Sequence, residues 1–161
     1  MGGGRRGPSV TVDELCRRHP RIALDSNVFI YVLEATEPWA AAGRALIRAL
    51  EAGNATGYLS SVALAEILTG PARKGDLAGV ECYNDEIRST KGLRIAGVPP
   101  EIAPDIAVIR GLRRLRLPDA IHLASARASG ATAFVTNDRE IRGSVKLEVI
   151  YLDELEADTI G

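Results

Sequence analysis

The chain has 161 residues, of which 46% are hydrophobic, and its formal net charge is −1. This is the size of one globular domain with enough apolar residues to bury a core. It has no apolar run long enough to cross a bilayer, so we predict no membrane association. The near-zero net charge excludes a strongly basic nucleic-acid-binding protein, and any contact with nucleic acid must come from local clusters of basic residues.

The two ends of the chain and its cysteines set the expected organisation. Residues 1–9 are rich in glycine and arginine, and no apolar segment follows them, so we expect a flexible tail rather than an export signal. Residues 10–161 contain no internal repeat and no linker, which predicts a single domain. Cys16 and Cys82 have no metal-ligand spacing and are interpreted as reduced thiols of a cytoplasmic protein.

Short apolar runs alternate with longer segments that suit helices. The runs predict strands at Arg21–Leu24, Ala55–Leu59, Leu93–Ala96, Ala131–Thr136 and Leu147–Leu152. Strands separated by helices form βαβ units, in which the strands lie parallel. We therefore predict an α/β fold with a central, mainly parallel sheet.

The segments between the strands carry helix signals. Trp39–Ala52 has its apolar residues at helical spacing and is followed by Gly53, which is typical of a helix end. Ser60 or Ser61 is expected to cap the next helix, which contains Glu66. A further helix is predicted over Pro100–Arg114, and Pro118 begins another.

Four acidic residues occupy unusual places in this pattern. Asp25 follows the first strand, and Asp138 comes directly after the strand that ends at Thr136. Glu66 lies within an otherwise apolar helix, and Asp119 lies at the start of the helix after Pro118. Because the carboxyl ends of parallel strands share one edge of the sheet, all four could converge on one crevice there.

Each acid also has a simpler interpretation. Asp25 could assist the cap of the following helix, Asp119 could complement a helix dipole, and Asp138 could belong to a turn. Glu66 is harder to explain, because a carboxylate among apolar residues needs a partner when it is buried. The joint pattern is therefore more informative than any one acid.

Clustered carboxylates repel one another unless a cation lies between them. Oxygen ligands without cysteine select Mg²⁺ or Mn²⁺ over zinc. Such ions can activate a water molecule and stabilise the charge that develops on a phosphoryl group. The four acids together predict metal-dependent phosphodiester hydrolysis.

Four blocks of the chain, in this order, resemble the PIN-domain family, and in particular the VapC-type toxin ribonucleases: LDSNVFIYVLE, SSVALAEILTG, LPDAIHLASA and FVTNDREI. The resemblance spans about residues 22–152. It matches Asp25, Glu66, Asp119 and Asp138 to the four acids of the family, Ser26 and Asn27 to its small polar residues, and Asn137 to a position that can share the role of Asp138.

The resemblance implies a three-layer α/β/α domain with Mg²⁺- or Mn²⁺-dependent endoribonuclease activity. It also implies a homodimer, an RNA substrate and a cognate antitoxin protein. We predict that the four acids bind the metal and are catalytic. Substrate contacts are predicted for Ser26, Asn27, Thr136 and Asn137.

Two further features have competing interpretations. His122 shares a helix face with Asp119, but a histidine beside Ile121 and Leu123 is more typical of a packed structural residue than of a metal ligand. Arg110, Arg113, Arg114 and Arg116 precede Asp119; they could contact RNA phosphates or simply face solvent.

Other classes of protein fit the sequence less well. A haloacid-dehalogenase-like phosphatase needs an acid at the position of Asn27. A receiver domain needs adjacent early acids and a late lysine in a better context than that of Lys146. A dinucleotide-binding domain needs a glycine-rich turn after its first strand. A PIN scaffold that binds RNA or protein without cutting is the main alternative, although the presence of all four acids argues against it.

Overall fold

A five-stranded parallel sheet forms the centre of the computed structural model, which describes residues 9–142 and 146–157. The strands lie in the order β4-β3-β2-β5-β6, and every neighbouring pair is parallel. Their bounds are β2 (Arg21–Leu24), β3 (Thr56–Ser60), β4 (Leu93–Ala96), β5 (Ala133–Thr136) and β6 (Glu148–Tyr151). The predicted α/β fold is confirmed, and the predicted strand ends differ by no more than one or two residues.

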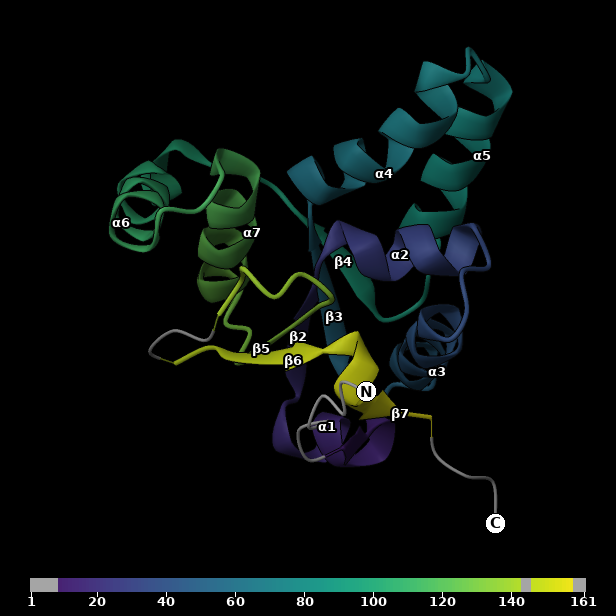
Figure 1. The fold of residues 1–161 in the computed structure, drawn as a ribbon, viewed down its shortest axis with the longest axis horizontal. Coiled ribbons are helices and arrows are strands. Elements are labelled where there is room, and N and C mark those ends of the chain that lie inside the picture. Colours follow the sequence, from purple (N-terminus) through teal and green to yellow (C-terminus); the bar gives the residue numbers. More distant parts are fainter. Residues whose placement is uncertain (1–8, 143–145, 158–161) are drawn as a thin grey trace, which may run out of the picture.

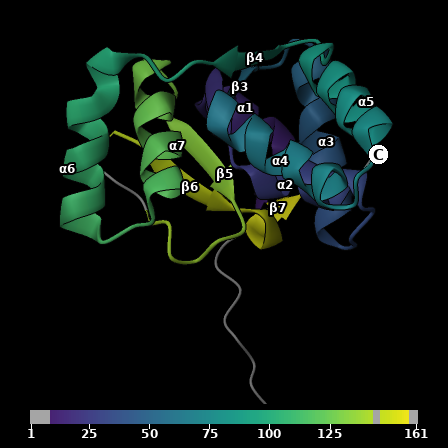
Figure 2. The same ribbon diagram turned by 90° about the horizontal axis from the view of Figure 1, so that it is seen from above.

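Helices cover both faces of this sheet (Figures 1 and 2). One layer is formed by α6 and α7, and the other by the five helices that precede them in the chain. The helix bounds are α1 (Val12–Arg18), α2 (Ser26–Leu33), α3 (Trp39–Glu51), α4 (Ser61–Arg73), α5 (Leu77–Arg88), α6 (Ala103–Arg113) and α7 (Leu117–Ala128). The three layers expected from the family resemblance are therefore present.

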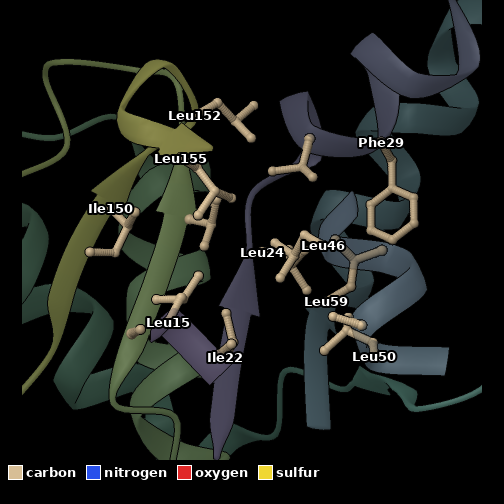
Figure 3. Packing of buried hydrophobic residues seen from close by; sticks show 14 of the residues in the cluster. Leu15, Ile22, Leu24, Phe29, Leu46, Leu50, Leu59, Ile150, Leu152 and Leu155 are labelled. Atoms are coloured by element: carbon tan, nitrogen blue, oxygen red, sulfur yellow. The ribbon is translucent and has the colours of Figure 1, made fainter. Parts of the chain in front are cut away.

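Successive residues of the central strands enter two separate cores. Ile22 and Leu24 of β2 pack on the side of α1 to α5, whereas Ala23 between them packs on the side of α6 and α7. Figure 3 shows Ile22 and Leu24 in the same cluster of buried residues as Leu46 and Leu50 of α3. This alternation follows from the pleat of a strand, which points neighbouring side chains to opposite faces. Because both faces are covered by helices, both sets of residues are apolar.

The order of the strands reverses next to β2. The chain proceeds outward from β2 to β3 and β4, and then returns to the other side of β2 with β5 and β6. In open parallel sheets the crevice for a ligand lies at the carboxyl ends of the strands, at the place where the order reverses. In this protein that place lies between the ends of β2 and β5, which are followed by Asp25 and Asn137.

Several local features differ from the prediction or were not predicted. Helix α6 ends at Arg113, because Arg114 adopts a left-handed conformation with φ of 54°. The segment Pro100–Ile102 forms a 3-10 helix in front of α6. The sequence did not reveal α1, nor a small parallel sheet in which β1 (Val10–Thr11) pairs with β7 (Leu155–Glu156), directly after a 3-10 turn at Leu152–Glu154. Residues 1–8 of the predicted tail lie outside the described residues.

None of the helices in residues 9–142 and 146–157 is long and apolar enough to span a membrane.

Candidate active site

Asp25 lies at the carboxyl end of β2 and is almost completely buried, with 5% of its surface exposed. Its Oδ1 accepts a hydrogen bond of 2.8 Å from the backbone N–H of Ser26, and its Oδ2 accepts one of 2.7 Å from the hydroxyl of Thr136. A longer contact of 3.4 Å reaches Oδ2 from the amide of Asn27. These donors hold one carboxylate in a fixed orientation, as a charged group at this depth requires.

The pKa of Asp25 is raised above its ordinary value, chiefly because burial disfavours the charged form. His122, Thr136 and the Ser26 amide lower the pKa, and the negative charge of Asp119 raises it further. The net direction means that the hydrogen bonds do not fully compensate for the loss of water. A cation beside Asp25 would favour its ionised form.

Glu66 and His122 meet across two helices. The carboxylate of Glu66 in α4 lies 2.5 Å from Nε2 of His122 in α7, measured from Oε1. The same nitrogen is 3.9 Å from Oδ1 of Asp25. The side chain of Glu66 is 35% exposed, so it faces the solvent side of the site, whereas that of His122 is 1% exposed. The predicted capping of α4 is confirmed, because Ser60 accepts a hydrogen bond from the N–H of Ala63.

Asp119 lies in the first turn of α7, one turn before His122, and is buried. Arg116 covers it from the solvent side, with Nε donating to Oδ2 at 3.2 Å. The hydrogen bond with Asp119 is the main reason that the pKa of Arg116 is raised, and the charges of Asp119, Asp138 and Glu66 add to it. Arg116 therefore lies in the combined field of three of the four acids.

Asp138 lies in the loop after β5 and is half-buried. Its N–H donates to the hydroxyl of Thr136 at 3.0 Å, and its Oδ1 accepts from the N–H of Glu140 at 2.9 Å. The same loop is joined to α2 by Asn137, whose N–H donates to Oδ1 of Asn27 at 3.3 Å. Thr136 thus links Asp25 and Asp138 through one hydroxyl group.

The four predicted acids are brought together from separate parts of the chain. Asp119 acts on the pKa of Asp25, and Asp138 and Glu66 act on that of Arg116, which touches Asp119. In addition, single ligand atoms of Asp25, Glu66 and His122 all lie within 4.8 Å of one another. Carboxylate oxygens with one imidazole nitrogen form a donor set that suits a divalent cation.

The sequence favoured a structural role for His122, and its burial agrees with that interpretation. The structure, however, points its Nε2 at two of the acids rather than into the apolar core. The spacing of three residues after Asp119 was the only signal in the sequence that could have indicated this position.

The four predicted phosphate-binding arginines have different surroundings. Arg110 and Arg114 are exposed, and Arg113 donates from Nη1 to the backbone carbonyl of Arg142 at 3.0 Å. Arg116 instead forms an ion pair with Asp119, one of the four acids. Arg114 lies just after the last residue of α6, in a left-handed conformation, and not within the helix as the sequence predicted.

Two grooves flank α2 on the side of α5. The first, of about 200 Å³, is lined by Ile30, Leu33, Ile67 and Tyr83 and reaches Glu66. The second, of about 300 Å³, is lined by Phe29, Val32, Leu33 and Ile87 together with charged residues of α3. Apolar side chains of α2 thus line both grooves, and the first groove reaches one of the four acids.

One protein-family model matches most of the chain. The PIN domain family model matches residues 22–143 of this chain. No curated protein sequence gives a significant match.

Several solved structures share the fold. VapBC2 from Rickettsia felis, bound to a DNA fragment from its promoter, is 18% identical over 81% of this chain and 98% of that chain, with a TM-score of 0.66. FitAB bound to an IR36 DNA fragment is 22% identical over 84% of this chain and 97% of that chain, with a TM-score of 0.64. VapC20 of Mycobacterium tuberculosis, a toxin that cleaves the sarcin-ricin loop, is 17% identical over 70% of this chain and 86% of that chain, with a TM-score of 0.54. The match of the family model over most of the chain, together with this fold, means that the chain belongs to the PIN domain family.

Proposed function

We propose that this protein is a divalent-metal-dependent endoribonuclease and the toxin of a toxin–antitoxin pair. The observation that carries the proposal is the convergence of Asp25, Glu66, Asp119 and Asp138 where the strand order reverses. Asp25 and Asp119 are buried, and neighbouring carboxylates repel one another unless a cation lies between them, which favours a metal site.

The four acids would hold Mg²⁺ or Mn²⁺. Such an ion supplies a water nucleophile at neutral pH and stabilises the charge on the phosphoryl group and on the leaving oxygen. Asp25 is best placed to anchor it, because its carboxylate is already oriented by Ser26 and Thr136. Asp119 lies close enough to raise the pKa of Asp25, and it accepts a hydrogen bond from Arg116.

Substrate binding would involve the polar residues around Asp25 and the arginines before Asp119. Asn27 and Asn137 are half-buried at the rim and could contact an RNA backbone. Ser26 and Thr136 are buried and orient Asp25 in the present structure. Arg110, Arg114 and Arg116 are exposed and could contact phosphates, as could Arg113 if it left the carbonyl of Arg142.

The grooves beside α2 suit an amphipathic helix of an antitoxin, since Ile30 and Leu33 offer apolar surface close to Glu66. The fold is shared with toxin–antitoxin complexes, which supports this part of the proposal. The proposal also includes a homodimer, a cytoplasmic location, and a single domain formed by residues 10–161.

Cleavage of a labelled single-stranded RNA by the purified protein tests the nuclease. We expect cleavage with Mg²⁺ or Mn²⁺, none in EDTA, and a loss of at least 100-fold in Asp119→Asn, which removes one negative ligand at nearly constant shape. Undiminished cleavage in EDTA would contradict a metal mechanism, whereas metal binding without cleavage would favour a non-catalytic scaffold.

Growth assays test the toxin. Expression of the chain should arrest growth, and co-expression of the protein encoded by the adjacent reading frame should restore it. Absence of rescue, together with absence of a complex on co-purification, would contradict the toxin–antitoxin proposal but not the nuclease.

A further inference from the structure

His122 is buried, but one of its ring nitrogens faces two carboxylates instead of apolar side chains. Its side chain is 1% exposed, and its Nε2 faces the carboxylates of Glu66 at 2.5 Å and Asp25 at 3.9 Å. These three residues form the one cluster of possible ligand atoms found in the part of the chain that the structure describes. A histidine that only filled space would not need both carboxylates beside the same nitrogen.

The other ring nitrogen is also held. Nδ1 of His122 lies 2.8 Å from the hydroxyl of Ser60, which ends β3 and caps α4. Histidine ligands of metals usually have such a second partner, which fixes the ring orientation. The chain therefore supplies the ligand atom, two neighbouring carboxylates and the group that orients the ring.

We infer that His122 Nε2 is a ligand of the divalent ion together with Asp25 and Glu66, and that this nitrogen makes the site prefer Mn²⁺ to Mg²⁺. The inference rests on the metal site of the proposed function and extends it, because the resemblance transfers only acids to this chain. Imidazole is a good ligand for transition-metal ions, whereas Mg²⁺ strongly prefers oxygen ligands.

The surroundings of the ring suit both the free and the metal-bound state. While Nε2 carries a proton, it donates to Glu66, and the hydroxyl of Ser60 can donate to Nδ1. Binding of a cation needs the lone pair of Nε2, so the proton must then be on Nδ1. The Ser60 oxygen can accept a hydrogen bond from this N–H, since it has two lone pairs and uses one for the N–H of Ala63. Both ring nitrogens therefore have a partner in either state.

Pulsed EPR of the Mn²⁺-loaded protein, prepared without a histidine tag, tests the ligand directly. The chain has two histidines. His19 lies before β2, at the opposite edge of the sheet, where its ring contacts Thr132 and Glu148. We expect a nitrogen hyperfine coupling to Mn²⁺ in the wild type, and the same coupling in His19→Gln. When the histidines carry ¹⁵N, the coupling should change by the ratio of the ¹⁵N and ¹⁴N gyromagnetic ratios. This measurement needs no change at His122.

Binding titrations test the preference. His122→Gln should weaken Mn²⁺ binding by about tenfold or more and Mg²⁺ binding by much less, because an imidazole nitrogen is a better ligand for Mn²⁺ than for Mg²⁺. Ser60→Ala should weaken Mn²⁺ binding in the same direction, while the matched control Ser61→Ala, at an exposed position of the same helix, should not.

The outcomes separate the inference from the proposed function. Mn²⁺ that binds in an Asp25-dependent manner without nitrogen coupling would overturn the inference and leave the metal nuclease intact. Equal weakening of Mn²⁺ and Mg²⁺ in His122→Gln would overturn the preference. Absence of any Asp25-dependent metal binding would contradict the metal site of the proposed function itself.

Discussion

The hydroxyl of Thr136 donates a hydrogen bond of 2.7 Å to Oδ2 of Asp25, and the same hydroxyl oxygen accepts the N–H of Asp138 at 3.0 Å. The two strands that these residues end, β2 and β5, are neighbours at the place where the strand order reverses. Thr136 is fully buried, so no water can replace its hydroxyl. One side chain thereby fixes two of the four acids.

Replacement of Thr136 by valine should reduce both stability and RNA cleavage. The substitution keeps the shape but removes the hydroxyl that serves Asp25 and the N–H of Asp138, which costs about 1–3 kcal/mol per group. Thr136→Ser keeps the hydroxyl and should retain most of the activity. Urea denaturation and initial cleavage rates of both variants provide the measurement, and equal activity of the valine and serine variants would contradict the role of the hydroxyl.

The metal-free protein should lose stability as the pH rises. Burial raises the pKa of Asp25 in the folded state above its ordinary value of 3.8, so the folded chain binds this proton more tightly than the unfolded chain. The free energy of unfolding then falls as the pH rises from the ordinary pKa to the raised one, and the decrease persists above it. Below the ordinary value, the contribution of Asp25 to stability does not change with pH.

Asp25→Asn removes the ionisable group of Asp25. In EDTA the free energy of unfolding of this variant should therefore not show the decrease with rising pH that is due to Asp25. In EDTA at neutral pH the variant should be the more stable of the two proteins, and saturating Mn²⁺ should make the wild type more stable than the variant. A ligand at 100 times its Kd stabilises the wild type by about 2.7 kcal/mol, whereas the variant lacks one of the carboxylates that bind the ion. Urea denaturation between about pH 3 and pH 8, with Asp85→Asn as a control away from the site, measures both effects. A variant whose stability falls with pH as that of the wild type does would show that Asp25 is not the group responsible.

Arg116→Gln should strengthen metal binding. The guanidinium donates a hydrogen bond to Asp119 and is attracted by the charges of Glu66 and Asp138. It therefore competes with a cation for the same negative charge. Because the side chain is 68% exposed, the gain should be modest, about two- to fivefold in Kd. Calorimetric titration with Mn²⁺ measures it, with Arg110→Gln as the control on the preceding helix. Unchanged affinity would mean that Arg116 does not compete with the metal.

The double substitution of Arg110 and Arg114 by glutamine tests whether these side chains bind RNA. If both contact phosphates, RNA affinity should fall for all sequences, and the log–log salt slope should decrease by roughly 0.7 for each phosphate that the protein no longer neutralises. The control pair Arg17→Gln and Arg88→Gln changes the net charge equally at exposed positions of α1 and α5. Equal salt slopes for the two double variants would mean that Arg110 and Arg114 only face solvent.

Leu33→Gln should weaken the complex with the protein encoded by the adjacent reading frame and leave RNA cleavage intact. Leu33 lines both grooves beside α2, and burial of a leucine side chain contributes about 1.5–3 kcal/mol to an interface. Leu112→Gln is a suitable control, because Leu112 is 82% exposed on α6, in the other helical layer. Co-purification of the three forms gives the measurement, and equal retention of the partner would exclude this groove.

The sequence by itself determined the sheet and the acids at its edge. Each strand of the sheet is a short apolar run, and such a run is recognisable without knowledge of its neighbours. Asp25 and Asp138 follow two of those runs closely, and parallel strands place their carboxyl ends on one side. Local spacing was therefore enough to predict the fold class and the position of these acids.

The tertiary structure alone decided which side chains touch. Glu66 and His122 are 56 positions apart and meet only because α4 and α7 pack together, so the imidazole enters the acid cluster. The pairing of β1 with β7 joins the two ends of the described chain, and residues so far apart in the sequence leave no periodic signal. Arg116 donates to Asp119, a contact that the sequence did not reveal. These contacts depend on the packing of distant segments, whereas patterns in a sequence report only on neighbours along the chain.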